Sequence, residues 1–466
     1  MSKHLTSKSV GRFFFVVLIL LGIVSSIYPA RHPDAAIDEI NHGNIAWMLT
    51  ATALVLLMTP GLSFFYGGMV KGKNIISTML QSFIALGVVS IIWYVVGFSL
   101  CFGESIGGVI GNPLSFAFFD NVGTASHPKI ATAIPFVLFA AFQLKFAIIT
   151  PALITGSFAE RIRFWSYVIF MCLFTMFIYC PVAHWVWHPD GFLFKLGVLD
   201  FAGGAVIHLS AGVAALVGAI VLGRRKTHVN NEIHTPSNVP YILLGTGLLW
   251  FGWFGFNAGS SLEANGVAIN ALLNTNMASA SAMICWILLD AINNKKPSSV
   301  GACIGAVVGL ATVTPAAGYI YPAHSILIGI IGSICSYYVV HWKNKSDIDD
   351  TLDVFPCHGV GGIVGMLLTG IFAKESGLIY GKFDLLIAQT IAIVVIGVYS
   401  YAITYLILKL TNAITPLRVS EKEEEIGLDI SQHDESIFSE MELIQTTQFE
   451  QTKTETNRSK KKGILY

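Results

Sequence analysis

The chain has 466 residues, of which 54% are hydrophobic and only 12% are charged, and its mean hydropathy is +0.67. This composition, with repeated apolar runs of about 20 residues, excludes a soluble protein and indicates an integral membrane protein. The formal net charge of zero argues against nucleic acid as a partner. The seven cysteines are an odd number and lie mostly in apolar runs, so we interpret them as buried small side chains.

The first 26 residues have the pattern of a secretory signal peptide. Lys3, Lys8 and Arg12 precede a 12-residue apolar core, and two serines at 25–26 follow that core. We therefore set residues 1–26 aside as a signal peptide before counting membrane spans. An uncleaved membrane anchor is the alternative interpretation of the same pattern.

Beyond this segment, continuous apolar runs without period-two alternation predict an all-α polytopic membrane protein and not a β-barrel. We expect eleven transmembrane helices, near residues 44–68, 75–100, 131–156, 164–187, 200–222, 240–258, 266–290, 300–318, 323–342, 355–373 and 383–410. They form one transmembrane domain over 44–410.

The basic residues of the loops predict the orientation of these helices. Loops after odd-numbered helices hold eleven cations: Lys71, Lys73, Arg161, Arg163, Arg224, Arg225, Lys226, Lys295, Lys296, Lys343 and Lys345. Loops after even-numbered helices hold only Lys129, Lys195, Lys374 and Lys382. By the positive-inside rule the first set is cytoplasmic. The mature N-terminus is therefore expected outside and the C-terminus inside the cytoplasmic (inner or plasma) membrane.

Two histidines interrupt apolar runs, His208 in the fifth predicted helix and His358 in the tenth. An ionisable side chain is expensive inside a membrane, so it marks a pathway, a relay or a partner. Because five is odd, two consecutive five-helix halves enter the membrane from opposite sides. The pattern predicts two inverted five-helix repeats plus a final helix, with the binding site near the midplane where the halves meet. The plainer interpretation is that each histidine bridges helices through a backbone carbonyl.

Asp200 stands at the start of the fifth predicted helix. Its carboxylate is expected to cap that helix by accepting free backbone N–H groups. Asp353, placed similarly before His358, is a candidate counterpart. Asp353 could equally belong to the acidic cluster of the cytoplasmic loop, which holds Asp347, Asp349 and Asp350.

Several long segments resemble the hallmark segments of ammonium transporters, the Amt branch of the Amt/Mep/Rh family. They are AERIRF at 159–164, DFAGGAVIH at 200–208, WFGFNAGS at 253–260 and DVFPCHGVGGIVG at 353–365. The resemblance runs from about Asn44 to about Glu435. It implies that His208 and His358 line a narrow hydrophobic pore and share a proton. Apolar surroundings and a like charge nearby both disfavour double protonation of such a pair.

The resemblance also assigns roles to aromatic and polar residues. Phe142 and Phe146 share a helix face, where core packing is the ordinary explanation, and Trp187 lies at a helix end typical of an aromatic belt. In the family the matching residues form an external cation site, here Phe142, Trp187 and Ser260, followed by a gate, here Phe146 and Phe256. Asp200, Trp253 and Asn257 are expected to support the site.

Lys145, between the two phenylalanines of FQLKF, departs from the family pattern. It is expected to face away from the pore or to extend toward a polar region. If it faced the external site, the assignment of that site would be in doubt.

The C-terminal part is a separate unit. Residues 411–436 resemble a cytoplasmic regulatory region that packs beneath the pore, with a solvated acidic tail as the alternative. The resemblance implies a homotrimer, and a PII-type signalling protein is a candidate partner at the cytoplasmic face. Residues 437–466 are polar, end in a basic cluster and are expected to be disordered.

The predicted function is therefore ammonium transport, with ammonium or ammonia as substrate and methylammonium as a further candidate. Ammonium would be bound outside, deprotonated, passed as ammonia and reprotonated inside, without a cofactor, metal or enzymatic step. An ammonium sensor that signals through its tail is the alternative. His184 and His188, four residues apart, suggest an intramembrane metalloenzyme, but no HExxH motif accompanies them.

Overall fold

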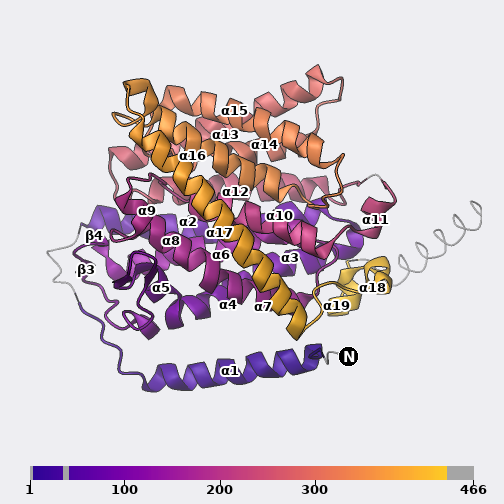
Figure 1. Cartoon of the computed structure of the whole chain (residues 1–466), viewed down its shortest axis with the longest axis horizontal. Helices are drawn as coiled ribbons and strands as arrows, with labels where there is room; N and C mark the ends of the chain where they lie inside the picture. The colour runs from indigo at the N-terminus through magenta and orange to yellow at the C-terminus, as the bar shows by residue number, and fades with distance from the viewer. Residues whose placement is uncertain (1–3, 35–40, 233, 438–466) are drawn as a thin grey trace, which may run out of the picture.

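A computed structural model describes residues 4–34, 41–232 and 234–437 of the chain (Figure 1). It is mostly helical, which confirms the predicted class of helical membrane protein. Eleven helical segments in the described residues are long and apolar enough to span a membrane. One of them is the N-terminal helix α1 (Ser7–Ile27), and the predicted eighth span, α14 (Ser299–Val313), is shorter than the others.

The first half of the molecule contains five spans. They are α2 (His42–Met69); α3 (Ile75–Phe83) continued by α4 (Ala85–Ile92), the π-helical turn η3 (Trp93–Gly97) and α5 (Phe98–Phe102); α6 (Phe136–Phe158); α7 (Phe164–Phe174) continued by η5 (Thr175–Tyr179) and α8 (Cys180–Trp187); and η6 (Gly204–Leu209) continued by α10 (Ser210–Leu222).

Five further helical segments follow in the chain. They are α12 (Val239–Gly259), α13 (Gly266–Ile292), the shorter α14, α15 (Pro322–Lys343), and the π-helical turn η7 (Phe355–Gly359) continued by α16 (Val360–Phe372). The final span, α17 (Asp384–Ile414), crosses diagonally over both halves in Figure 1.

The two ends of the bundle carry different elements. One end, called the strand end below, carries the short helix α9 (Phe192–Lys195) and two small antiparallel sheets (Figure 1). The paired strands are β1 (Ser105–Ile106) with β2 (Ile110–Gly111), and β3 (Ser126–His127) with β4 (Ala131–Pro135). The opposite end, called the tail end, carries α11 (Lys226–Val229), α18 (Glu421–Ile426) and α19 (Leu428–His433).

Four predicted helix boundaries differ from the structure by four or five residues: the fifth span begins at Gly204 instead of residue 200, the last ends at Ile414 instead of residue 410, and the other two lie close to a proline. The third span begins at Phe136 instead of residue 131, because residues 131–135 form β4 and end in Pro135. A proline disfavours helical geometry in the residue before it. The eighth span ends at Val313 instead of residue 318, close to Pro315, which has no N–H to donate into a continuing helix; Thr314 between them still has helical dihedral angles (φ −49°, ψ −47°).

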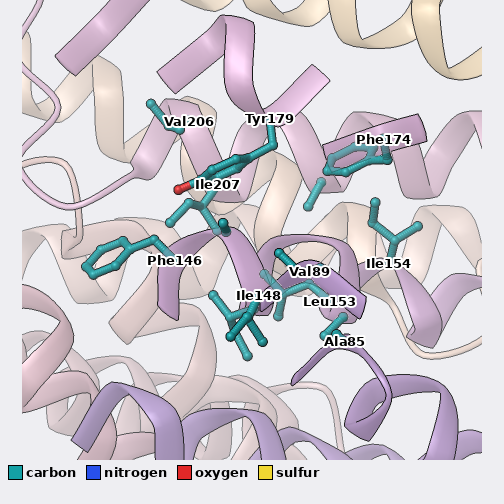
Figure 2. Packing of buried hydrophobic residues seen from close by; sticks show 14 of the residues in the cluster. Ala85, Val89, Phe146, Ile148, Leu153, Ile154, Phe174, Tyr179, Val206 and Ile207 are labelled. Atoms are coloured by element: carbon teal, nitrogen blue, oxygen red, sulfur yellow. The ribbon is translucent and has the colours of Figure 1, made fainter. Parts of the chain in front are cut away.

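Close packing of α6 against its neighbours forms the core of the first half. Figure 2 shows Ile148 and Leu153 of α6 beside Val89 of α4, with Ile207 of η6 on one side of them and Ile154 of α6 on the other. All five side chains are essentially inaccessible to solvent. This core fixes the depth at which η6, and with it His208, is held.

The N-terminal helix α1 lies along one side of the bundle, apart from the other helices in Figure 1. Phe14 stacks on Trp165 of α7 with ring centroids 6.0 Å apart, and the Ser25 hydroxyl lies 2.9 Å from that of Tyr94. The helix is otherwise largely exposed. Its removal as a signal peptide stays a prediction.

Candidate functional site

His208 and His358 meet at the centre of the bundle, each within a π-helical turn that opens its helix. Their ring centroids are 5.2 Å apart and the ring planes are inclined by 16°. Both side chains are buried. Among the described residues, neither ring nitrogen of His208 has a hydrogen-bond partner, nor does Nδ1 of His358. The plainer interpretation of His208 as a bridge to a backbone carbonyl is therefore wrong.

The predicted cap of the fifth helix is formed by Asp200. Its Oδ1 accepts hydrogen bonds from the N–H groups of Gly203 (2.9 Å) and Gly204 (2.6 Å). Its Oδ2 accepts those of Ala205 (2.8 Å) and Val206 (3.0 Å). Four donors that a helix start leaves free are satisfied by one buried carboxylate.

The counterpart of Asp200 in the second half is Asp350 and not Asp353. Each aspartate stands eight residues before its histidine, in DFAGGAVIH and in DTLDVFPCH. Asp350 Oδ2 accepts the N–H of Phe355, the first residue of η7, at 2.7 Å. Asp353 occupies the position of Gly203, and both have a positive φ, 59° and 110°. The equal spacing of eight residues between aspartate and histidine is visible in the sequence, and it is the signal that could have identified Asp350.

The helices that precede the two caps also end alike. Trp187 is the last residue of α8, and its Nε1 donates to the backbone carbonyl of Asp200 at 2.9 Å. Lys343 is the last residue of α15, and its Nζ donates to the backbone carbonyl of Asp350 at 2.6 Å. Lys343 also forms an ion pair with Asp353 at 2.7 Å.

The two histidine helices cross through glycines in a reciprocal manner. A Cβ on Gly212 of α10 would lie 2.2 Å from the backbone nitrogen of Gly359. A Cβ on Gly362 of α16 would lie 2.8 Å from the backbone nitrogen of Leu209, so each glycine meets the nitrogen of the residue after the other helix's histidine. Each glycine stands four residues after its histidine, and small residues let membrane helices approach this closely. Reciprocal contact is what a pseudo-two-fold axis between two inverted halves requires.

Aromatic rings stack between the strand end and the histidines. Phe146 of α6 and Phe256 of α12 lie face to face, with centroids 4.2 Å apart and planes inclined by 18°. The Trp253 ring stacks on His208 at 5.4 Å. Phe146 and Phe256 are almost inaccessible to solvent, and the ring centroid of Phe256 lies 6.3 Å from that of His208.

Two cavities of about 240 Å³ each lie above this stack at the strand end. They share Trp187 and Ser260, two of the predicted binding residues, together with Phe194 and Phe201. The Ser260 hydroxyl donates to the carbonyl of Phe256 at 2.8 Å, which leaves the lone pairs of its oxygen available to accept. The arrangement combines an aromatic face with a hydroxyl acceptor, which suits a small cation that carries N–H donors.

The other predicted residues lie close by, but not all of them line these cavities. Phe142 is fully buried behind Phe146, at 4.8 Å between ring centroids. Trp253 Nε1 donates to Thr314 Oγ1 and Asn257 Nδ2 to Thr275 Oγ1, each at 2.9 Å. Both bonds tie α12 to neighbouring helices, which agrees with a supporting position.

Two lysines bear on the electrostatics of the strand end. Lys145 is half-buried and belongs to neither cavity lining, so it does not disturb the predicted cation site. The exposed Lys129 does line the rim of one cavity, which sequence reasoning missed. Because Lys129 is exposed, solvent screens its charge.

His184 and His188 stack with centroids 4.4 Å apart. The ring nitrogens of His184 lie 2.8 Å from the Cys101 carbonyl and 2.8 Å from the Ser105 hydroxyl, so both are engaged. No group of three or more metal-binding side chains occurs in the described ranges. This pair is interpreted as structural.

A cavity of about 750 Å³ opens at the tail end beside buried ion pairs. Arg225 pairs with Glu160 (2.5 Å) and with Asp349 (2.8 Å). Burial alone would raise the pKa of both carboxyls. Arg225 nevertheless holds the pKa of Glu160 below its ordinary value, and Arg161 and Arg225 together do the same for the pKa of Asp349. The pairs fix the walls of this cavity.

The tail-end helices α18 and α19 dock through carboxylates that cap other helices. Asp429 accepts the N–H groups of Ile76 (3.1 Å) and Ser77 (2.8 Å) at the start of α3. Glu424 accepts the N–H of Lys226 at 2.7 Å, where α11 begins. Glu423 pairs with Arg163 at 2.7 Å. This part of the tail is therefore packed against the bundle, and the alternative of a fully solvated acidic tail is wrong for it.

A polytopic helical membrane fold that holds cavities at one end, a stacked pair of aromatic rings and a buried histidine pair is typical of membrane transport proteins. The sequence profile of the Ammonium Transporter Family matches residues 46–438. The Bacillus subtilis ammonium transporter is 45% identical over 406 residues, 85% of this chain and 99% of that protein. The Archaeoglobus fulgidus ammonium transporter Amt1 is 41% identical over 405 residues, 86% and 100% of the two chains.

Solved structures agree with this match. Saccharomyces cerevisiae Mep2 has a TM-score of 0.78 at 34% identity, covering 82% of this chain and 88% of Mep2. A structure titled Sensor Amt Protein has a TM-score of 0.78 at 31% identity, covering 84% of this chain and 98% of its own. The chain belongs to the ammonium transporter family.

Proposed function

We propose that this protein takes up ammonium by binding it at the strand end, removing a proton and passing ammonia through the centre of the bundle. The observation that carries the proposal is the buried pair His208 and His358, whose imidazoles face each other behind the aromatic stack. Imidazole nitrogens without protein partners can accept a proton from, or hydrogen-bond to, a passing nitrogen atom.

Energetics favour a neutral species in the inner path. A desolvated cation-π contact with Trp187 contributes roughly 2 kcal/mol, enough to recruit a cation but far too little to move it across hydrocarbon. Potassium resembles ammonium in size and charge but has no proton to lose. A closed aromatic stack that admits only the neutral molecule therefore selects ammonium chemically.

The predicted site residues near the strand end have separate roles in this scheme. Trp187 and Ser260 bind the cation, with Phe142 behind them shaping the site. Phe146 and Phe256 form the gate and separate the cavities from the histidines. Asp200 holds the turn that carries His208 and supplies negative potential near the cavity, which Asp200 lines.

The strand end faces outward in this proposal, because most loop cations lie at the tail end. Residues 1–26 act as a signal peptide, and the tail from residue 411 is cytoplasmic. Family membership supports a homotrimer, and a PII-type protein is the proposed partner at the tail-end cavity.

The test is uptake of labelled methylammonium into proteoliposomes that contain the purified protein. We expect saturable uptake that ammonium inhibits and potassium does not. A Trp187→Leu protein serves as the matched variant of the binding site. Uptake that is inhibited equally by potassium would contradict the selection by deprotonation.

An ammonium sensor is the second candidate, favoured by the similarity to the structure titled Sensor Amt Protein and by the docked helices α18 and α19. In that case ammonium would bind at the strand end and change the docking of the tail without net flux. Binding by calorimetry together with no uptake in the same proteoliposomes would favour this alternative over transport.

A further inference from the structure

Lys343 holds at the tail end the place that Trp187 holds at the strand end. Each is the last residue of the membrane span that precedes its aspartate cap. Each donates its side-chain hydrogen bond to the backbone carbonyl of the aspartate eight residues before a pore histidine. The two contacts are thus equivalent in position and in bonding, but one side chain is an aromatic ring and the other is a primary ammonium group.

A second pair of positions differs in a complementary way. Gly203 and Asp353 both stand five residues before a histidine and both have a positive φ. Where the first half has glycine, the second half has a carboxylate, and that carboxylate forms the 2.7 Å ion pair with Lys343. The side chains of this pair are only 8% and 15% exposed, so solvent screens their attraction little.

The Lys343 group has the same chemistry as the proposed substrate, because its Nζ is an alkylammonium with N–H donors. It donates to a carbonyl and contacts a carboxylate, which are the acceptors that a free ammonium ion would use. Both Lys343 and Asp353 line the tail-end cavity. A cation that entered this cavity would meet acceptors already occupied by the protein's own ammonium group.

We propose that Lys343 acts as a tethered substitute for the substrate and so denies the tail-end cavity a recruitment site for ammonium. Recruitment is then confined to the strand end, where Trp187 offers an aromatic face instead of a charge. This inference rests on the proposed transport function and adds to it the residue that makes binding one-sided. Lys343 is a specificity-determining residue and takes no part in the proton transfer.

The proposal is tested by initial methylammonium flux in proteoliposomes of known orientation, at zero membrane potential, with substrate added at either end. The wild-type protein should show a half-saturation concentration at least about tenfold higher from the tail end than from the strand end. Lys343→Met exposes the acceptors and should lower the tail-end value about tenfold while leaving the strand-end value unchanged.

A passive pore must have the same ratio of maximal rate to half-saturation concentration from both sides. When Lys343→Met lowers the tail-end half-saturation concentration, the maximal rate from the tail end should therefore fall by the same factor. The ratio of maximal rate to half-saturation concentration should therefore stay unchanged in Lys343→Met. General damage to the protein would lower this ratio, so the two effects can be told apart. Lys296→Met removes an exposed tail-end charge outside the cavity lining and should change neither value.

A folding defect in Lys343→Met is avoided by the double change Lys343→Trp with Asp353→Gly. It copies the strand-end pair, removes both charges together and places glycine at a positive φ. It should bring the tail-end half-saturation concentration within about threefold of the strand-end value. An unchanged ratio between the two ends in both variants would overturn the proposal. A wild-type protein without saturable strand-end flux would instead overturn the proposed function.

Discussion

The two half-sites around the histidines share one backbone design and differ in the side chains placed on it. Both have an aspartate cap, a residue of positive φ, a π-helical turn, a histidine and a crossing glycine. The side chains at two equivalent positions differ. The first half has Trp187 where the second has Lys343, and Gly203 where the second has Asp353. The shared backbone design explains why the two histidines meet at the centre. The different side chains explain why the two ends of the bundle differ chemically.

The largest expected effect comes from removing a cap, and the two caps are not equal. Asp200→Ala leaves four buried N–H groups without their acceptor and should cost at least about 3 kcal/mol of stability and nearly all flux. Asp350→Ala removes the acceptor of two such groups, those of Phe355 and Val354, and should cost less. Thermal unfolding and uptake of both purified variants test the difference. Equal losses would show that the caps are equivalent after all.

The crossing glycines should behave alike, because their contacts are reciprocal. Gly212→Ala and Gly362→Ala each place a methyl group against backbone at less than 3 Å, and each should destabilise by about 1–3 kcal/mol. Gly87→Ala and Gly397→Ala meet open space in the described structure and serve as controls for thermal unfolding. A strong effect at only one of the two crossing glycines would argue against the pseudo-two-fold axis.

Trp187→Leu should raise the strand-end half-saturation concentration for methylammonium about tenfold, because it removes the aromatic face of the cavity. It also removes the hydrogen bond to the Asp200 carbonyl, so Trp187→Phe, which keeps a ring but loses the bond, separates the two contributions. If Trp187→Phe were as impaired as Trp187→Leu, the bond and not the ring would be the main contribution.

The smallest expected effect concerns the docked tail, which only the tail end possesses. Burial raises the pKa of Glu423, but Ser420 and Arg163 outweigh it and hold this pKa below 4.5. A carboxyl whose pKa is lowered by folding stabilises the docked state above its unfolded pKa and loses that contribution as the pH falls through the folded value. The pair is partly exposed, so the contribution is at most about 1 kcal/mol.

Accessibility of the tail to an acid-tolerant protease should therefore increase below about pH 4.5. In Arg163→Gln the increase should begin at a higher pH, because the partner that lowers the Glu423 pKa is absent. A profile that is identical in wild type and variant would contradict the role of this ion pair.

Much of the fold could be predicted because each membrane span is a long apolar run in the sequence. The helix order and the positions of His208 and His358 followed from hydropathy alone. Local backbone choices could not be predicted in the same way: Pro135 and Pro315 moved two helix ends, and Asp353 was considered as the cap that Asp350 supplies. The equivalence of Trp187 and Lys343 was hidden because the loops after them differ in length and only the bonds reveal it.

The most direct test of the account compares ammonium and potassium currents with labelled uptake in three proteins, the wild type, His208→Ala and His358→Ala. The account predicts that the wild type passes ammonium and excludes potassium, because only ammonium can become neutral at the aromatic stack. It also predicts that each histidine variant loses most ammonium flux or its discrimination against potassium. Equal potassium permeation by the wild-type protein would contradict the account.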